Sequence, residues 1–251
     1  MNLVSIIIPV YNITFFREAF NSAYNQNYKN KEIIIIYDNN KKKDFEKINK
    51  IINKKKNIKL NNNKKNFGVA TARNIGIKYA KGNFLAFLDS DDCWHKNKLK
   101  IQIDFMKRYK SNFTHTSYNI IDDKNKIVGN QIAKKMLSYK DLLKSCDIGL
   151  STVVLKKKII LNYNFPKLKT KEDYALWLKL IKKNKIIGIN KKLCSWRRSS
   201  QSLSSSILRK IFDAFKVYYD RENLNFFISI FRVIILSCNY FFKRIRQKIY
   251  F

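Results

Sequence analysis

The sequence predicts an α/β fold with an open, mostly parallel sheet, a mixed second half and amphipathic helices at the end of the chain. Three apolar runs, at 4–10, 32–37 and 84–88, are rich in β-branched or aromatic residues and are typical of strands covered on both faces. Apolar residues at helical spacing separate these runs, and acidic residues follow two of them. Ligands of open parallel sheets bind beyond the carboxyl ends of the strands, so the acids indicate where the site lies.

The first half, residues 1–110, alternates strands with helices. Between the first two strands, helical spacing is shown by Phe16, Phe20, Ala23 and Tyr24. A short strand at 58–60 precedes a second helix, whose apolar residues are Ala70, Ala72, Ile75, Ile77, Tyr79 and Ala80. A further helix is expected over 98–109.

The second half, residues 111–205, predicts a mixed sheet packed on the first half as one domain, 1–205. Segments 113–118 and 150–155 read as strands with a turn at 122–125 between them. A helix over 172–182 and a short strand at 186–189 follow.

Residues 206–251 predict a basic helical tail. An apolar stripe begins at Ile207, and a second, strongly apolar helix over 226–242 contains Arg232 and ends in basic residues. This second helix is short for a membrane span and carries a charge, so we expect it to lie on an anionic bilayer. The alternative is a helix packed on the protein's own core.

Composition admits two explanations for the charge. The chain has 251 residues, 45% of them hydrophobic, and a formal net charge of +34. Such a charge suggests a polyanion or membrane partner, but Lys, Asn and Ile are abundant throughout, as expected from an AT-rich coding sequence. The four cysteines form no CxxC pair and the chain starts without a signal-peptide pattern, which favours reduced thiols in the cytoplasm.

An arginine and an acidic cluster predict a diphosphate held with a divalent metal. Asp89, Asp91 and Asp92 directly follow the apolar run at 84–88, and Arg73 precedes that run among small residues. Clustered carboxylates at the end of a buried strand are costly unless they face water or a cation.

Five motifs, in order, resemble family 2 glycosyltransferases, which are inverting enzymes with the GT-A fold. They are VSIIIPVYN, EIIIIYDNN, NFGVATARNIG, FLDSDD followed by Trp94, and KEDYALWLKL. The resemblance covers about residues 3–205 and implies an enzyme of the bacterial surface-glycan type.

The resemblance assigns the nucleotide base to the first two motifs. Pro9, Val10 and Tyr11 look like the loop that lines the base, and Asp38 matches the acid that accepts the N3–H of uracil. A carboxylate only accepts hydrogen bonds, so it suits uracil or thymine, and the donor is expected to be a UDP- or dTDP-sugar. The alternative for Asp38 is a turn residue that caps backbone amides.

The next two motifs imply the diphosphate and metal contacts. Arg73 resembles the residue that approaches the diphosphate, with a surface salt bridge as its alternative. Asp91 is expected to bind Mn²⁺ or Mg²⁺, and Asp89 to support the ribose or the metal. Asp92 is expected to orient this loop or to cap the helix after it.

The last motif implies the base of an inverting reaction. Asp173 matches the carboxylate that takes the proton from the acceptor hydroxyl, and Glu172 is the competing candidate. Many relatives place a metal-binding histidine near the end of this domain, whereas the matching stretch here, 195–204, has none. Arg197 or Arg198 is expected to neutralise the diphosphate instead.

The leading hypothesis is a sugar transfer to a glycan or lipid-linked acceptor in surface polysaccharide or lipopolysaccharide synthesis. We expect a cytoplasmic enzyme, peripheral on the inner face of the plasma membrane, with no nucleic-acid partner. The alternative is a non-catalytic polyanion- or nucleic-acid-binding protein, but its basic runs lack interleaved aromatic residues. A dinucleotide-dependent enzyme is disfavoured because no GxGxxG follows the first strand.

Overall fold

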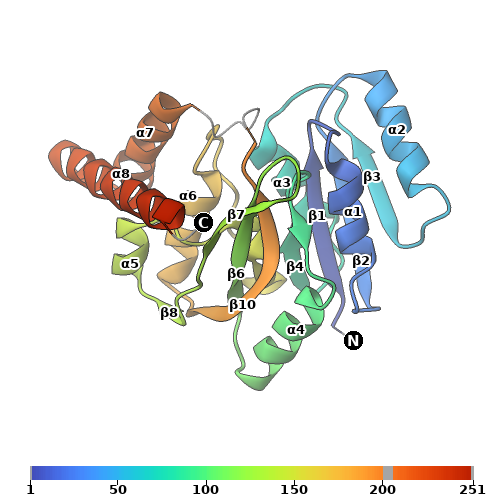
Figure 1. Ribbon diagram of the computed structural model, residues 1–251, viewed down its shortest axis with the longest axis horizontal. Helices are drawn as coiled ribbons and strands as arrows, with labels where there is room; N and C mark the ends of the chain where they lie inside the picture. Colours follow the sequence, from blue (N-terminus) through green and yellow to red (C-terminus); the bar gives the residue numbers. More distant parts are fainter. Residues whose placement is uncertain (1, 200–205, 250–251) are drawn as a thin grey trace.

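A single mixed sheet runs through the molecule, with helices on both faces (Figure 1). The computed structural model describes residues 2–199 and 206–249. Its strands are β1 Val4–Val10, β2 Lys31–Tyr37, β3 Ile58–Asn62, β4 Phe84–Phe87, β5 Cys93–Trp94, β6 Phe113–Ile121, β7 Ile127–Gln131, β8 Met136–Leu137, β9 Val154–Lys156 and β10 Ile186–Arg197. Its α-helices are α1 Phe16–Tyr24, α2 Lys42–Ile52, α3 Val69–Tyr79, α4 Lys98–Arg108, α5 Tyr139–Lys144, α6 Glu172–Ile181, α7 Ile207–Lys216 and α8 Phe226–Ile249. Shorter turns are η1 Leu150–Thr152, η2 Lys157–Ile159 and η4 Val217–Arg221.

The sheet has a parallel half and a mixed half. Its main path is β3-β2-β1-β4-β9-β6-β10-β5, with β7 beside β6 and β8 beside β10. Strands β3, β2, β1 and β4 are all parallel, whereas β9 runs antiparallel to both β4 and β6. Parallel strands end at the same edge, so the segments after β1, β2 and β4 meet there.

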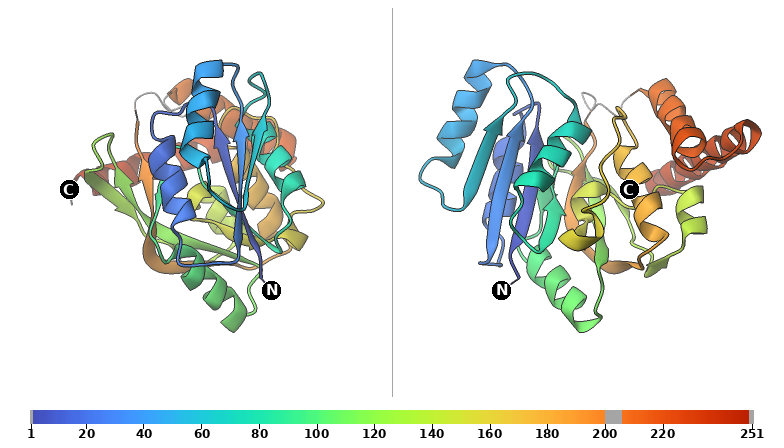
Figure 2. Two further views of the ribbon diagram at one scale, coloured as in Figure 1. Left: turned by 90° about the vertical axis from the view of Figure 1, so that its right-hand side faces the viewer. Right: turned by 180° about the vertical axis from the view of Figure 1, so that it is seen from behind.

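Each face of the sheet carries its own apolar core. Along β1, Ile6 and Ile8 belong to the core under α1 and α4, while Ile7 between them belongs to the core under α3 and α6. This alternation is the period of two that a strand imposes on its side chains. The view from behind in Figure 2 shows α3, α5 and α6 on the second face.

Most of the predicted elements are present, and the differences are local. Segment 150–155 is not one strand, because η1 occupies its first three residues and β9 begins only at Val154. The turn at 122–125 is present but leads into β7, which pairs antiparallel with β6. The strand predicted at 186–189 is β10, which extends to Arg197.

The tail packs on the body by one face only. Its inner residues Ala214, Val217, Tyr218, Val233 and Leu236 join the same core as α6. Helix α8 contains an 18-residue window, Phe226–Lys243, that is long and apolar enough to cross a membrane by length and composition, and only 17% of this window is buried. One face of the tail contacts the core, as the core-packing alternative predicts. The other face leaves apolar side chains exposed, which is compatible with the predicted membrane contact.

Candidate active site

The segment after β4 is a tight acidic turn that forms hydrogen bonds with residues of β10 and η1. The Asp92 backbone N–H donates to the Asp89 carbonyl at 3.1 Å, and the Asp89 N–H donates to the Ser151 hydroxyl at 3.1 Å. Asp92 is buried and its carboxylate accepts from the Arg197 N–H at 2.9 Å, so Asp92 orients the loop, one of the two roles expected for it. Burial, together with the charge of Asp89, raises the pKa of Asp91 to about 6.

Arg73 joins this acidic turn to the start of α6. Its buried guanidinium donates to Asp89 at 2.7 Å and also to Glu172. Burial opposes its charge, but the carboxylates of Asp89, Glu172 and Asp173 outweigh burial and raise its pKa. Arg73 is therefore not a surface salt bridge: carboxylates engage both of its terminal nitrogens, and its contact with a diphosphate stays a prediction.

Helix α6 begins at the two acids predicted as alternative bases. Lys171, just before the helix, adopts a left-handed conformation with φ 65°. Glu172 is buried against Arg73, and burial raises its pKa to about 7. Asp173 is only partly buried, its carboxylate accepts from the Tyr174 N–H at 2.7 Å, and burial raises its pKa too. Arg73 thus occupies Glu172 and leaves Asp173 as the more accessible acid.

Asp38 organises the loop before α3. Its carboxylate accepts from the Asn63 side chain at 2.8 Å and from the backbone N–H groups of Phe67 at 3.1 Å and Gly68 at 2.8 Å. Asp38 is buried, and Gly68 has a φ of 89°, which favours glycine. This is the amide-capping arrangement that was the alternative for Asp38, and the predicted contact with uracil stays untested.

Two exposed aromatic residues contact the turn after β2 through their backbones. Pro9 and Val10, predicted in a loop, are instead the buried last residues of β1, where Val10 pairs with Tyr37. Tyr11 does lie beyond the strand and is 49% exposed, and its carbonyl accepts from Asn39 at 3.0 Å. Phe67 is 47% exposed, and its N–H is held by Asp38. Sequence reasoning missed Phe67, although its place before Gly68 in the third motif was a usable signal.

The two arginines near the end of β10 differ in their surroundings. Arg197 is buried, and its guanidinium donates to four protein groups, the carbonyls of Asp91 and Asp122 and the side chains of Glu18 and Asn125. This geometry argues against the predicted diphosphate contact of Arg197, since its donors already hold the acidic turn and the β6–β7 hairpin. Arg198 is only partly buried, and its N–H donates to the Ile121 carbonyl at 2.8 Å.

Negative charge is in excess at this edge of a strongly basic protein. Four carboxylates, those of Asp89, Asp91, Glu172 and Asp173, interact with the guanidinium groups of Arg73 or Arg197, and a fifth, that of Asp92, accepts from the Arg197 backbone N–H. Within residues 2–199 and 206–249, no three His, Cys, Asp or Glu side chains converge as a complete metal cage. A pair of carboxylates that shares a cation with substrate phosphates is how Mg²⁺ is usually held, and the donor set of Asp89 and Asp91 fits that pattern.

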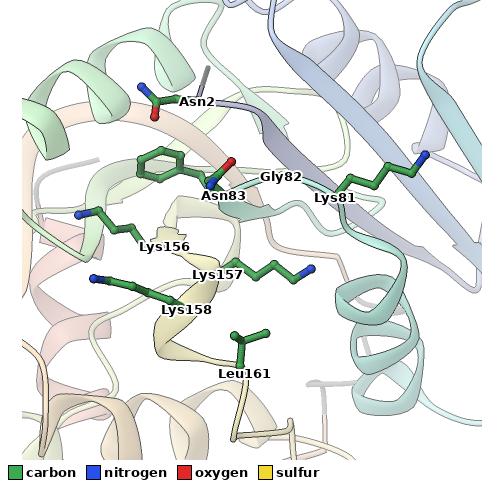
Figure 3. A pocket seen from close by; sticks show the side chains of 9 residues that line it. Asn2, Lys81, Gly82, Asn83, Lys156, Lys157, Lys158 and Leu161 are labelled. Atoms are coloured by element: carbon green, nitrogen blue, oxygen red, sulfur yellow. The ribbon is translucent and has the colours of Figure 1, made fainter.

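A basic pocket lies at the other end of the central strands, away from the acidic turn. Figure 3 shows this cavity of about 470 Å³, lined by Asn2, Lys81, Gly82, Asn83, Phe84, Lys156, Lys157, Lys158 and Leu161. It lies where β4 begins, whereas the acidic turn lies where β4 ends. The pocket is therefore separate from the acidic site.

Solved structures with the same fold are known. The chain superposes on the crystal structure of S. aureus TarS 1–349 in complex with UDP-GlcNAc with a TM-score of 0.70 and 21% identity, over 86% of this chain and 64% of that one. It also superposes on the mannosyltransferase PcManGT from Pyrobaculum calidifontis in complex with GDP-Man and Mn²⁺, with a TM-score of 0.66 and 13% identity, over 88% of this chain and 64% of that one. The chain thus spans less than two thirds of either solved chain, and these likenesses show the predicted GT-A fold.

Sequence relatives establish the family. The UDP-Glc:alpha-D-GlcNAc-diphosphoundecaprenol beta-1,3-glucosyltransferase WfgD of Escherichia coli is 42% identical over 206 residues, which is 81% of this chain and 80% of WfgD. The putative teichuronic acid biosynthesis glycosyltransferase TuaG of Bacillus subtilis is 32% identical over 89% of this chain and 90% of its own. The family model for glycosyl transferase family 2 matches residues 5–163. This chain therefore belongs to glycosyl transferase family 2 and is a glycosyltransferase, as its motifs predicted.

Proposed function

We propose that the enzyme transfers a sugar from a UDP- or dTDP-sugar to a lipid-linked glycan acceptor by inverting single displacement, in surface polysaccharide synthesis. Relatives support the substrate class, since WfgD is named for UDP-glucose and a diphosphoundecaprenol acceptor, and a TarS structure contains UDP-GlcNAc. The observation that carries the proposal is the Arg73 bridge from Asp89 to Glu172, which ties the acidic turn of the first half to α6 of the second half.

Asp173 is the proposed base. An inverting transfer needs one carboxylate that removes the proton from the acceptor hydroxyl as the hydroxyl attacks the anomeric carbon. Glu172 is occupied by Arg73, whereas Asp173 accepts only from the neighbouring Tyr174 amide among the described residues. Burial raises the pKa of Asp173, which makes its carboxylate a stronger proton acceptor near neutral pH.

Asp89 and Asp91 are the proposed ligands of a divalent cation, Mn²⁺ or Mg²⁺. When bound, such a cation neutralises charge on the diphosphate that leaves with the nucleoside. Arg73 fixes the carboxylate of Asp89 in position, and Arg197 fixes the backbone of Asp91 through its carbonyl. We assign these two arginines to the construction of the site, and the direct diphosphate contact to Arg198.

The nucleotide base is proposed to lie against Phe67 and Tyr11. Both rings are exposed, and the backbones of both residues contact the turn that Asp38 and Asn39 form. An aromatic ring stacks on any pyrimidine, so this arrangement supports base binding without fixing the sugar. Asp38 then acts by holding the Phe67–Gly68 backbone in position.

Apolar side chains on the tail support attachment to an anionic membrane surface. The outer tail face is formed by Ile207, Leu208, Ile211, Phe212, Phe227, Ile230, Phe231, Ile234 and Phe241, all of them exposed. The opposite face of α8 is fixed to the body by Asn239, which donates to the Lys144 carbonyl, and by Lys243, which pairs with Asp147. A helix fixed along its length on one side favours lying in the interface over crossing the bilayer, and the net charge of +34 favours anionic lipid on the cytoplasmic side.

A transfer assay with three variants tests the reaction. The enzyme is incubated with a panel of UDP- and dTDP-sugars, Mn²⁺ and a GlcNAc-diphospho-lipid, and the products are analysed for linkage and anomeric configuration. We expect inversion at the anomeric carbon, a loss of roughly a thousandfold in Asp173→Asn, and residual transfer in Glu172→Gln, which keeps an acceptor for Arg73. Full activity of Asp173→Asn, or retention at the anomeric carbon, contradicts the proposed mechanism.

A vesicle-binding assay tests the membrane proposal. Phe227→Ser with Phe231→Ser should weaken binding to phosphatidylglycerol vesicles by at least about tenfold, because each buried Phe contributes about 1.5–3 kcal/mol. The matched control is Tyr109→Ser, which removes an exposed ring beyond α4, away from the tail. Equal binding of the double variant and the control to these vesicles refutes the tail as the contact.

A further inference from the structure

The inner side of the tail contacts the segment that leads into α6. Asp213 of α7 is buried, and one oxygen of its carboxylate accepts from both the Thr170 N–H at 2.8 Å and the Thr170 hydroxyl at 2.9 Å. Two hydrogen bonds to one carboxylate oxygen are strong, because the acceptor is charged. Thr170 is thereby fixed from the tail, two residues before Glu172.

This fixed residue precedes a costly backbone conformation. Lys171 has φ 65° and ψ 11°, in the left-handed region that non-glycine residues seldom adopt. Such a conformation costs on the order of 1–3 kcal/mol and persists only where the surroundings impose it. The turn directs Glu172 to Arg73 and places Asp173 beside it at the start of the helix.

Two more contacts fix the same helix to the tail. The Tyr218 hydroxyl lies 2.9 Å from the Tyr174 hydroxyl, and each of the two hydroxyls also lies within hydrogen-bond distance of a carbonyl of α5. At the other end of α6, Lys182 pairs with the buried Glu222 at 2.6 Å. The tail therefore contacts α6 near both of its ends, and Asp213 contacts the segment that leads into the two acids.

We propose that Asp213 is a positioning residue for the reaction: through Thr170 it holds the left-handed turn at Lys171 and so sets the position of Asp173. This inference rests on the proposed function, because it takes Asp173 as the base. It gives the tail a role in turnover that is separate from membrane attachment. A turn that relaxes moves the base away from the acceptor hydroxyl, and a misplacement of about 1 Å costs up to about a hundredfold in rate.

The test compares Asp213→Ala with Asp213→Asn in the full-length enzyme. Asparagine keeps an oxygen that accepts both Thr170 hydrogen bonds, whereas alanine removes it. We expect kcat to fall about tenfold to a hundredfold in Asp213→Ala, with the UDP dissociation constant and donor KM within about twofold of the wild type. Asp213→Asn should recover most of the rate. The matched control is Asp220→Ala, an exposed acid on the same tail, which should leave kcat unchanged.

Thr170→Val provides a second measurement that does not alter the tail. It removes the hydroxyl but keeps the N–H, so kcat should fall by less than in Asp213→Ala, and the two changes should combine to less than the product of their separate effects. This variant decides the inference if Asp213→Ala fails to fold.

The outcomes separate this inference from the proposed function. If wild type transfers sugar and Asp173→Asn does not, while Asp213→Ala or Thr170→Val retains full kcat, the positioning role is wrong and the proposed base stands. If Asp213→Ala weakens UDP binding as much as it lowers kcat, the role is general stability, which also overturns the inference. An active Asp173→Asn variant removes the proposed base, and this inference with it.

Discussion

Replacing Lys98 with methionine should stabilise the protein and flatten its pH dependence. Lys98 starts α4, its side chain is fully buried, and its ammonium group has no hydrogen-bond partner among the described residues. Its nitrogen lies 4.1 Å from the centre of the Trp94 ring. Burial lowers the pKa of Lys98 from 10.5 to about 7.

The magnitude follows from linkage. One pH unit of difference in pKa corresponds to about 1.4 kcal/mol, so a charged Lys98 costs the folded state up to roughly 5 kcal/mol below pH 7. Between pH 7 and 10.5 the unfolded chain binds this proton and the folded chain does not. The contribution of Lys98 to stability therefore rises with pH across that window. The contact with Trp94 offsets about 1–2 kcal/mol of the gain from substitution.

Urea denaturation at pH 6, 8 and 10 measures the effect. We expect Lys98→Met to raise the free energy of unfolding at pH 6 by about 2–4 kcal/mol, and the gain to shrink towards pH 10. The control Lys100→Met alters an exposed side chain in the same helix and should stay within about 0.5 kcal/mol of wild type. A destabilised Lys98→Met protein, or one with an unchanged pH dependence, refutes this reasoning.

Three further predictions concern the site and its support. Phe67→Ala should raise the UDP dissociation constant about tenfold in calorimetry, because base stacking contributes about 1–3 kcal/mol, and an unchanged value excludes the base contact. Gly76→Ala should lower the free energy of unfolding by about 1–3 kcal/mol, because the new Cβ falls 2.4 Å from a methyl group of Ile7; a neutral substitution shows that α3 can shift off β1. Chelation with EDTA should lower transfer at least about tenfold and Mn²⁺ should restore it, whereas Asp91→Asn should respond weakly to added Mn²⁺; equal responses of wild type and variant exclude Asp91 as a ligand.

The elements that depend on local pattern were predictable from sequence. Runs such as 4–10 and 32–37 have one favoured structure, because continuous β-branched residues suit a strand covered on both sides. The acids after β2 and β4 had to reach the carboxyl edge of the sheet once those strands were parallel. Sequence therefore identified the family and placed the candidate site at this end of the strands without any tertiary information.

The partners of the arginines were not predictable in the same way. Arg73 and Arg197 match residues expected near phosphate, and the small residues around Arg73 indicate a partly buried neighbourhood but not which groups the two arginines contact. Their burial follows from tertiary contacts over long separations, of Arg73 with Glu172 and of Arg197 with Glu18. An isolated motif identifies a residue type that suits phosphate, but competing carboxylates from distant segments decide what the side chain binds.

The tail shows most clearly how tertiary contacts can divide an amphipathic pattern. The sequence places Ile207, Leu208, Ile211, Phe212, Phe215, Tyr218 and Tyr219 on one stripe and Asp213 opposite it, and an amphipathic helix ordinarily buries its apolar stripe. Here Tyr218 near the end of the stripe is buried, whereas Ile207, Leu208, Ile211 and Phe212 at its start are exposed and Asp213 is buried against Thr170. Exposed apolar patches of this kind mark contacts with membranes or other proteins. The exposed apolar side chains and the buried Asp213 of α7 are both explained if each side of this helix has a partner. This requirement connects the proposed membrane contact of the exposed side with the proposed positioning of Asp173 by the buried side.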